Sequence, residues 1–346
     1  MTQRKPLAIA TALTLCSVPA LAAADSVQSR SDMQIYGRAH LSVDHLDDGA
    51  DYSEMNLSSN SSRLGFRGQT DFGTVTGIFQ VEQEIDFSNS GSAWASRDTF
   101  AGIRGGFGTL RAGKFDTPFK RARGPANLFG DQLGDMRNLT RVGDGRFDER
   151  GQNTIHYQTV NFNGLQFNLA YAFHEGDDAE EDAKEEAISA SVTYKAGPLD
   201  FALAHEAWGE DTERGERDGI RLAAGYDVTP ELKVVGFYQS LSNDQDNVED
   251  STTMGAGAQY KVAAATYLRV HHFIFDSDGD DLDAAMTAAG IEHRIDSALR
   301  VYANYAMVDN DDNQALTPWR QARTTDTAGA AGETATGFSV GLRYDF

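Results

Sequence analysis

Apolar and polar residues alternate along much of this chain with a period of two. From Met33 to Asp44 every odd position is apolar or small, and nearly every even position is polar. The last residues, 338–346, repeat the pattern, as do residues 165–173 and 298–307. Because successive side chains of a β-strand point to opposite faces, this period predicts strands with one apolar face and one polar face.

Short turns separate the predicted strands at regular intervals. Most turn centres are roughly 33 to 35 residues apart, the length of two ten-residue strands and one longer loop. Seven such turns, together with the two terminal strands, predict sixteen strands. The predicted turns are residues 70–74, 105–109, 160–164, 195–198, 227–231, 261–265 and 294–298.

The longer connections are rich in aspartate and glutamate, as residues 175–186 and 276–283 illustrate. Acidic residues therefore gather at one end of every predicted hairpin. A soluble two-layered sandwich does not need this difference between its ends. A barrel with short turns at one rim and long, charged loops at the other has it.

The width of a sixteen-stranded barrel decides which face points outward. Its lumen is too wide for side chains to fill, so we expect water and polar residues inside and the apolar face outside. In a bilayer, a closed barrel pairs every backbone group without leaving an edge. The predicted fold is thus all-β, a transmembrane 16-stranded antiparallel β-barrel. No run of 18 apolar residues follows residue 22, so no transmembrane helix is expected.

The N-terminal segment has the features of an export signal. A positively charged start precedes an apolar run at 7–18 and an A-x-A sequence that ends at Ala22. This order predicts a cleaved signal peptide at residues 1–22 and a barrel domain at residues 23–346. The only cysteine, Cys16, lies in the predicted signal, so the mature chain is expected to have no disulfide bond.

The charge balance excludes one class of partner. The chain has 30 Lys and Arg residues against 52 Asp and Glu residues, a formal net charge of −22. The phosphates of nucleic acids would be repelled by this charge, so no nucleic-acid partner is expected.

One stretch, 107-FGTLRAGKF-115, has the glycine and lysine spacing of a phosphate-binding loop. Such a loop needs Ser or Thr after the lysine, and it connects a strand to a helix. Here Phe115 follows Lys114, and the alternation of Leu110 and Ala112 with polar or small neighbours is typical of a strand. The stretch therefore predicts a turn followed by a strand.

Motifs for metal binding and catalysis are incomplete. The run 276-DSDGDD-281 resembles the start of a calcium-binding EF-hand loop, but Asp281 replaces its glycine and Thr287 its closing glutamate. The eight histidines are scattered, and neither H-E-x-x-H nor G-x-S-x-G occurs. We therefore predict no catalytic residue, no metal site and no cofactor, and we do not expect an enzyme.

Four segments resemble those of Gram-negative general porins. They are 62-SRLGFRGQTDFGTVTGIFQVEQEID-86, 97-RDTFAGIRGGFGTLRAGKFDTPF-119, 150-RGQNTIHYQTVNFNGLQFNLAYAF-173 and 337-GFSVGLRYDF-346. The resemblance implies an outer-membrane homotrimer that contacts lipid and lipopolysaccharide and lets small hydrophilic solutes and ions diffuse passively. The terminal Phe346 resembles the signal that the barrel assembly machinery reads.

The resemblance also implies a constriction. In these porins the third long loop, here roughly residues 115–149, folds inward, and its acidic residues face arginines on the barrel wall. The residues implied on the wall are Arg38, Arg63, Arg67 and Lys114, and those implied on the loop are Asp131 and Asp135. Alternation places the three arginines on the polar face. Lys114 rests on the resemblance alone, because alternation from Leu110 turns it outward unless a bulge intervenes.

The charges in the sequence give opposing predictions for whether the channel prefers cations or anions. The acidic loops and the negative net charge favour a mild preference for cations, whereas the wall arginines oppose it. Lys120, Arg121 and Arg123 further depart from a purely acidic loop. Two alternatives to a general channel stay open. One is a porin specific for a sugar or an anion, and the other is a surface protein whose barrel anchors adhesive or cation-binding loops.

Overall fold

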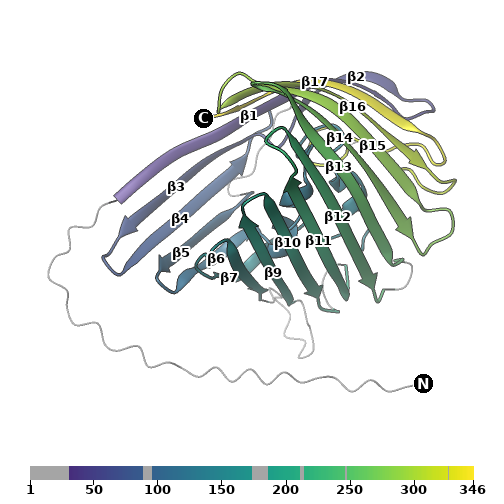
Figure 1. Cartoon of the computed structure of the whole chain (residues 1–346). Helices are drawn as coiled ribbons and strands as arrows, with labels where there is room; N and C mark the ends of the chain where they lie inside the picture. The colour runs from purple at the N-terminus through teal and green to yellow at the C-terminus, as the bar shows by residue number, and fades with distance from the viewer. Residues whose placement is uncertain (1–30, 89–95, 174–185, 211–213, 246–247, 326) are drawn as a thin grey trace, which may run out of the picture.

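The computed structural model describes residues 31–88, 96–173, 186–210, 214–245, 248–325 and 327–346, and in these ranges antiparallel strands form a barrel (Figure 1). The strands are β1 (Ser31–Asp47), β2 (Ser53–Ser59), β3 (Arg63–Asp71), β4 (Val75–Glu84), β5 (Thr99–Gly105), β6 (Gly108–Asp116), β7 (Arg150–Gln158), β8 (Leu165–Ala172), β9 (Ala187–Ala196), β10 (Leu199–Trp208), β11 (Arg217–Asp227), β12 (Leu232–Asn243), β13 (Ser251–Ala263), β14 (Thr266–Ser277), β15 (Ala284–Arg294), β16 (Leu299–Asn310) and β17 (Ala335–Asp345). The predicted signal peptide and nearly all of the acidic run 175–186 lie outside the described residues.

The barrel closes with sixteen strands because β2 and β3 act as one interrupted strand. Both pair with β1, on its second and first half respectively, and residues 60–62 separate them. On its other edge β1 pairs with β17, which completes the ring. The backbone of Phe346 extends this closure by exchanging hydrogen bonds with Gly37, at 2.8 and 3.0 Å. The predicted sixteen-stranded antiparallel barrel is confirmed.

The turn predictions are confirmed as well. Each of the seven predicted turns connects two consecutive strands, from the β3–β4 turn to the β15–β16 turn. The longer connections alternate with them and therefore lie at the opposite rim. Because turn signals come from local residues, the sequence was sufficient to place them.

Large apolar side chains cover the outer face of the barrel. Leu203, Ile220 and Ile274, for example, are 42%, 48% and 44% exposed, whereas their strand neighbours point inward. A continuous apolar surface of this kind suits lipid rather than water. Exposed aromatic residues mark the short-turn rim, as in transmembrane barrels, and include Phe72, Phe107, Phe162, Tyr226, Tyr260, Tyr344 and Phe346. Within the described ranges, no helix is long and apolar enough to cross a membrane.

The inner face differs from the expectation of a polar, water-filled lumen. On β12, β14 and β15 the inward residues Phe237, Phe273 and Met286 are buried. They form an apolar cluster with Met136 and Leu139, which belong to the connection between β6 and β7. A loop therefore replaces water over this part of the wall. The alternation of a strand reports its two faces, but it does not reveal what a distant segment covers.

We call residues 117–149 the inner loop. It contains the short helices α1 (Pro118–Arg121) and α2 (Arg137–Thr140) and the 3₁₀ turn η1 (Gly124–Ala126). Side chains on the inner wall donate hydrogen bonds to its backbone carbonyls. Arg221 Nη1 reaches Phe119 O at 2.9 Å, and Arg269 Nη1 reaches Leu128 O at 2.8 Å. These contacts fix the inner loop against the wall formed by β11 to β14.

Candidate pore constriction

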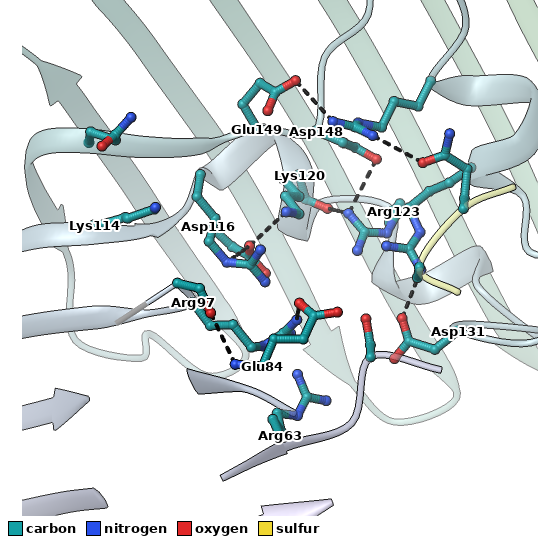
Figure 2. Close-up of a pocket in the computed structure, with 18 residues that line it drawn as sticks. Arg63, Glu84, Arg97, Lys114, Asp116, Lys120, Arg123, Asp131, Asp148 and Glu149 are labelled. Carbon is teal, nitrogen blue, oxygen red and sulfur yellow. Dashed lines mark hydrogen bonds and ion pairs between the residues drawn. The ribbon is translucent and has the colours of Figure 1, made fainter. Parts of the chain in front are cut away.

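A charged cavity of about 510 Å³ lies between the inner loop and the wall around β3 to β7 (Figure 2). Eight cationic side chains line it, namely Arg63, Arg97, Lys114, Lys120, Arg123, Arg137, Arg141 and Arg150. Five anionic side chains also line it, namely Glu84, Asp116, Asp131, Asp148 and Glu149. The lining therefore has a formal charge of +3, opposite in sign to the charge of the whole chain. We call this cavity the passage.

Asp131 connects the inner loop to the wall. Its Oδ2 atom accepts a hydrogen bond from Arg38 Nη1 at 3.2 Å, and its Oδ1 atom accepts one from Arg137 Nη2 at 2.7 Å. Burial alone would raise the pKa of Asp131, but Arg137, Arg63 and Arg38 outweigh it and hold the pKa well below its usual range. The carboxylate is thus ionised and neutralises part of the arginine charge.

Two wall arginines share one carboxylate. Arg97, just before β5, donates from Nε to Glu82 Oε1 at 2.6 Å and from Nη1 to Glu84 Oε2 at 2.9 Å. Arg63 Nη1 lies 3.6 Å from the same Glu82 oxygen. Because Glu82 is already engaged by Arg97, the charge of Arg63 is only partly balanced.

A second group lies where the inner loop begins. Lys120 Nζ is 2.9 Å from Asp116 Oδ1, and Arg150 Nε is 3.2 Å from the same oxygen. Burial lowers the pKa of the Lys120 amine to about 8, although the neighbouring Asp116 carboxylate opposes this shift. Lys120 is therefore a cation whose charge changes just above neutral pH.

Lys114 lines the passage. No carboxylate of the described residues lies within salt-bridge distance of its amine, which in Figure 2 points toward Asp116 and Lys120. The pairing of β6 with β7 shifts register between Gly113 and Phe115, and Gly113 has a φ of 141°. This irregularity lies at the position where the sequence requires a bulge for Lys114 to face inward.

The structure brings together four of the six residues implied for the constriction. Arg63, Lys114 and Asp131 line the passage, and Arg38 contacts Asp131. Asp135 does not line it. Its buried carboxylate accepts hydrogen bonds from Arg137 Nη2 at 2.6 Å and from the backbone N–H of Asp131 at 2.7 Å, so it holds the loop in shape.

Arg67 lies apart from the passage. Its guanidinium donates to Gln34 Oε1 at 2.8 and 3.0 Å and stacks over the ring of Tyr36, 4.8 Å from its centroid. Arg67 lies four residues farther along β3 than Arg63 and is therefore nearer to the β3–β4 turn. Alternation identifies its face but not its depth in the barrel.

Sequence reasoning missed several lining cations. Arg97 lies just before β5 and Arg150 is the first residue of β7, so both adjoin long connections. Arg137 begins α2, and Arg141 directly follows it. The local composition of the sequence did indicate these cations. Residues 120–150 contain seven of the 30 Lys and Arg residues of a strongly acidic chain. A basic segment in such a chain indicates a site where positive charge is needed.

A closed barrel with an apolar outer face and a charged internal passage defines the class of outer-membrane channels. The chain matches the Gram-negative porin family over residues 10–313 and belongs to that family. It is a passive diffusion channel of the outer membrane, and its porin relatives are channels rather than enzymes.

Three similar proteins illustrate the relationship. Outer membrane porin protein 32 of Delftia acidovorans is 29% identical over 96% of this chain and 99% of the relative. The structure of an anion-selective porin from Comamonas acidovorans is 25% identical, with a TM-score of 0.78 over 92% of this chain and 100% of that one. An outer membrane protein of Vibrio cholerae, solved in a trimer form, is 19% identical, with a TM-score of 0.67 over 91% and 99% of the two chains.

Proposed function

We propose that the passage filters solutes by charge and that the channel prefers small anions. The observation that carries this proposal is the lining of eight cationic and five anionic side chains. A narrow passage with low-dielectric walls concentrates the field of such charges on the permeating ion. Arg63, Lys114 and Lys120 supply positive charge, while Asp131 balances Arg38 and Arg137. The anion selectivity in the name of the Comamonas relative supports the same sign.

The acidic outer loops favour the opposite sign, but they act from farther away. At physiological ionic strength, charges separated by more than about 8–10 Å of water are largely screened. Carboxylates at the rim therefore affect an ion in the passage less than a guanidinium that lines it. This comparison favours anions over the mild cation preference that the loops suggest.

The lining also bears on the alternatives to a general channel. None of the described residues that line the passage is aromatic, whereas a sugar-specific channel would gather aromatic residues along the solute path. An ion filter suits this lining better. A barrel that only anchors adhesive loops would not need an internal charged passage.

The test is the zero-current potential of single channels in a planar bilayer across a potassium chloride gradient. We expect stable conductance steps and a potential whose sign shows that chloride is more permeant than potassium. A potassium preference would contradict the proposed filter while leaving the channel itself intact.

We further propose a route of assembly. Cleavage after Ala22 would leave residues 23–346, and the terminal Phe346 would present the signal for the barrel assembly machinery. Its side chain is 51% exposed, which suits recognition from outside the barrel. The trimer form of the Vibrio relative supports a homotrimer embedded in lipid and lipopolysaccharide. N-terminal sequencing of the purified protein and its mass in detergent test the cleavage site and the trimer.

A further inference from the structure

We propose that the last long connection, described at residues 311–325 and 327–334, is a second loop that shapes the pore, and that the buried ion pair between Arg323 and Asp44 holds it in place. We call this connection the last loop. The proposal concerns the size of the passage, so it is independent of the sign of charge selectivity. Asp44 and Arg323 are positioning residues in this inference.

The last loop packs inside the barrel against the inner loop. Trp319 is fully buried, and its Nε1–H donates to Thr327 O at 2.9 Å. Its indole belongs to one apolar cluster with Phe129 and Leu133 of the inner loop. Burying a tryptophan beside these side chains anchors one part of the last loop to the inner loop.

Hydrogen bonds extend this contact to the edge of the passage. Gln321 N donates to Asn138 Oδ1 at 3.0 Å, and Arg141 Nη1 donates to Gln321 Oε1 at 3.1 Å. Gln321 and Ala322 themselves line the passage. Ala322 has a φ of 61°, which a residue other than glycine rarely adopts without support from its surroundings.

The backbone around Ala322 is supported by contacts that the next two residues make with β1 and β2 of the barrel wall. Arg323 Nη2 donates to Asp44 Oδ2 on β1, and both side chains have no exposed surface. Beside this pair, Ser59 N on β2 donates to Thr324 Oγ1 at 2.9 Å. The last loop thus bridges the inner loop and the β1–β2 wall, with Gln321 and Ala322 between these two attachments.

The position of the last loop depends on this ion pair because both of its side chains are buried. Asp44 is the only carboxylate within salt-bridge distance of Arg323 among the described residues. If Asp44 loses its charge, the Arg323 guanidinium is left buried without compensation, which is strongly unfavourable. The wall strand is held by its ladder of hydrogen bonds, whereas a loop moves more easily. The last loop would therefore leave the wall so that Arg323 reaches water, and Gln321 and Ala322 would leave the passage.

The experiment compares single-channel conductance in planar bilayers. Asp44→Asn is expected to raise conductance roughly 1.5-fold or more, because conductance follows the open cross-section of the pore. The matched control is Asp44→Asn with Arg323→Met, which removes both charges and leaves no buried ion to be solvated. This double variant is expected to raise conductance less than Asp44→Asn does, because it lacks the ion pair but the buried Trp319 and the Ser59–Thr324 hydrogen bond still attach the loop. Only barrels that resist sodium dodecyl sulfate before heating are assayed.

A disulfide clamp separates loop release from a general distortion. Ser58 Oγ and Thr324 Oγ1 are 3.5 Å apart, so cysteines at these positions lie within reach of a disulfide bond. In the Asp44→Asn variant, Ser58→Cys with Thr324→Cys should restore the wild-type conductance when oxidised. Reduction with dithiothreitol should raise it again.

Two results would overturn the proposal. One is an Asp44→Asn channel of wild-type conductance, and the other is a raised conductance that the oxidised clamp does not reverse. Should Asp44→Asn fail to assemble, replacing residues 317–325 with Gly-Ser-Gly tests the same point without a buried charge. Unchanged conductance in this shortened channel would equally exclude a pore-shaping role for the last loop.

Discussion

The Asp131 carboxylate on the inner loop accepts a hydrogen bond from Arg38 on β1, with 3.2 Å between Oδ2 and Nη1. The same carboxylate pairs with Arg137 at 2.7 Å. Each guanidinium also has a second carboxylate partner, Asp345 at 2.7 Å for Arg38 and Asp135 at 2.6 Å for Arg137. Asp131 is therefore one member of a balanced charge network beside the passage. The strength of the charge filter depends on this balance, because each unpaired charge acts directly on a permeating ion.

Asp131→Asn is expected to increase the preference for anions. Asparagine tolerates the φ of 60° at this position, so the backbone should stay in place while the negative charge is lost. A unit charge about 8 Å from an ion in water contributes roughly 0.5 kcal/mol, which changes the ion's partitioning by about a factor of two. The zero-current potential should therefore show at least about a two-fold higher ratio of chloride to potassium permeability.

The control for this change is Asp51→Asn, which removes an exposed carboxylate in the β1–β2 connection at the outer rim. Screening by salt should make its effect much smaller. An equal shift in both variants would show that rim charges set the selectivity, contrary to the proposed filter.

Lys114→Gln is expected to weaken anion preference without weakening the barrel. The Lys114 amine has no carboxylate partner among the described residues, so its removal leaves no group unpaired. The matched control is Arg67→Gln, since Arg67 lies on the same inner face but outside the passage. Zero-current potentials should separate the two variants. A larger effect from Arg67 would place the filter nearer the short-turn rim.

Anion preference is expected to fall as the pH rises through about 8, the pKa to which burial lowers Lys120. Lys120 then loses its positive charge in the passage. The zero-current potential, measured from pH 6.5 to 9.5, should follow this titration. Lys120→Arg is the control, because arginine stays charged over this range, and its channel should lose the pH dependence. A pH dependence that persists in Lys120→Arg would assign the titration to another group.

The same pKa shift has a consequence for stability. An unfolded lysine titrates near pH 10.4, so between about pH 8 and pH 10.4 the unfolded chain binds more protons at this residue than the folded chain does. The contribution of Lys120 to the free energy of unfolding should therefore increase with pH across this window. Lys120→Arg should lack this contribution when its urea unfolding is measured at several pH values.

Asp148→Asn is expected to loosen the inner loop. Asp148 and its partner Arg221 are both completely buried, and Arg221 also supports the backbone of Phe119. Breaking a buried ion pair from one side costs about 3–5 kcal/mol in the free energy of unfolding. Urea unfolding in lipid vesicles should report this loss. Glu149→Gln is the control, because Glu149 is partly exposed and its ion pairs should contribute only about 0–1 kcal/mol each.

The barrel itself was predictable because its signals are local. The alternation over residues 33–44 follows from the geometry of a single strand, and the turns follow from short runs such as 70–74. These two patterns gave the number of strands, their direction and the outward apolar face. Even the interruption between β2 and β3 did not disturb the count, because both segments pair with β1.

The candidate site was predictable only in part. Alternation and family resemblance pointed to Arg38, Arg63, Lys114 and Asp131, which the structure brings together at the passage. The same reasoning grouped Arg67 with them, although it lies at another depth of the barrel. Depth depends on the stagger of neighbouring strands, which an alternating pattern in one strand does not contain.

The sequence alone therefore determined a sixteen-stranded membrane barrel, because strand period, turn chemistry and the apolar face are encoded residue by residue. Only the tertiary structure decided what fills the barrel. Phe237 and Met286 are buried on an inner wall that alternation predicts to be wet, because Met136 and Leu139 of the inner loop, far along the chain, pack against them. Those contacts depend on where a loop folds back, and they set the passage whose charge is opposite to that of the chain.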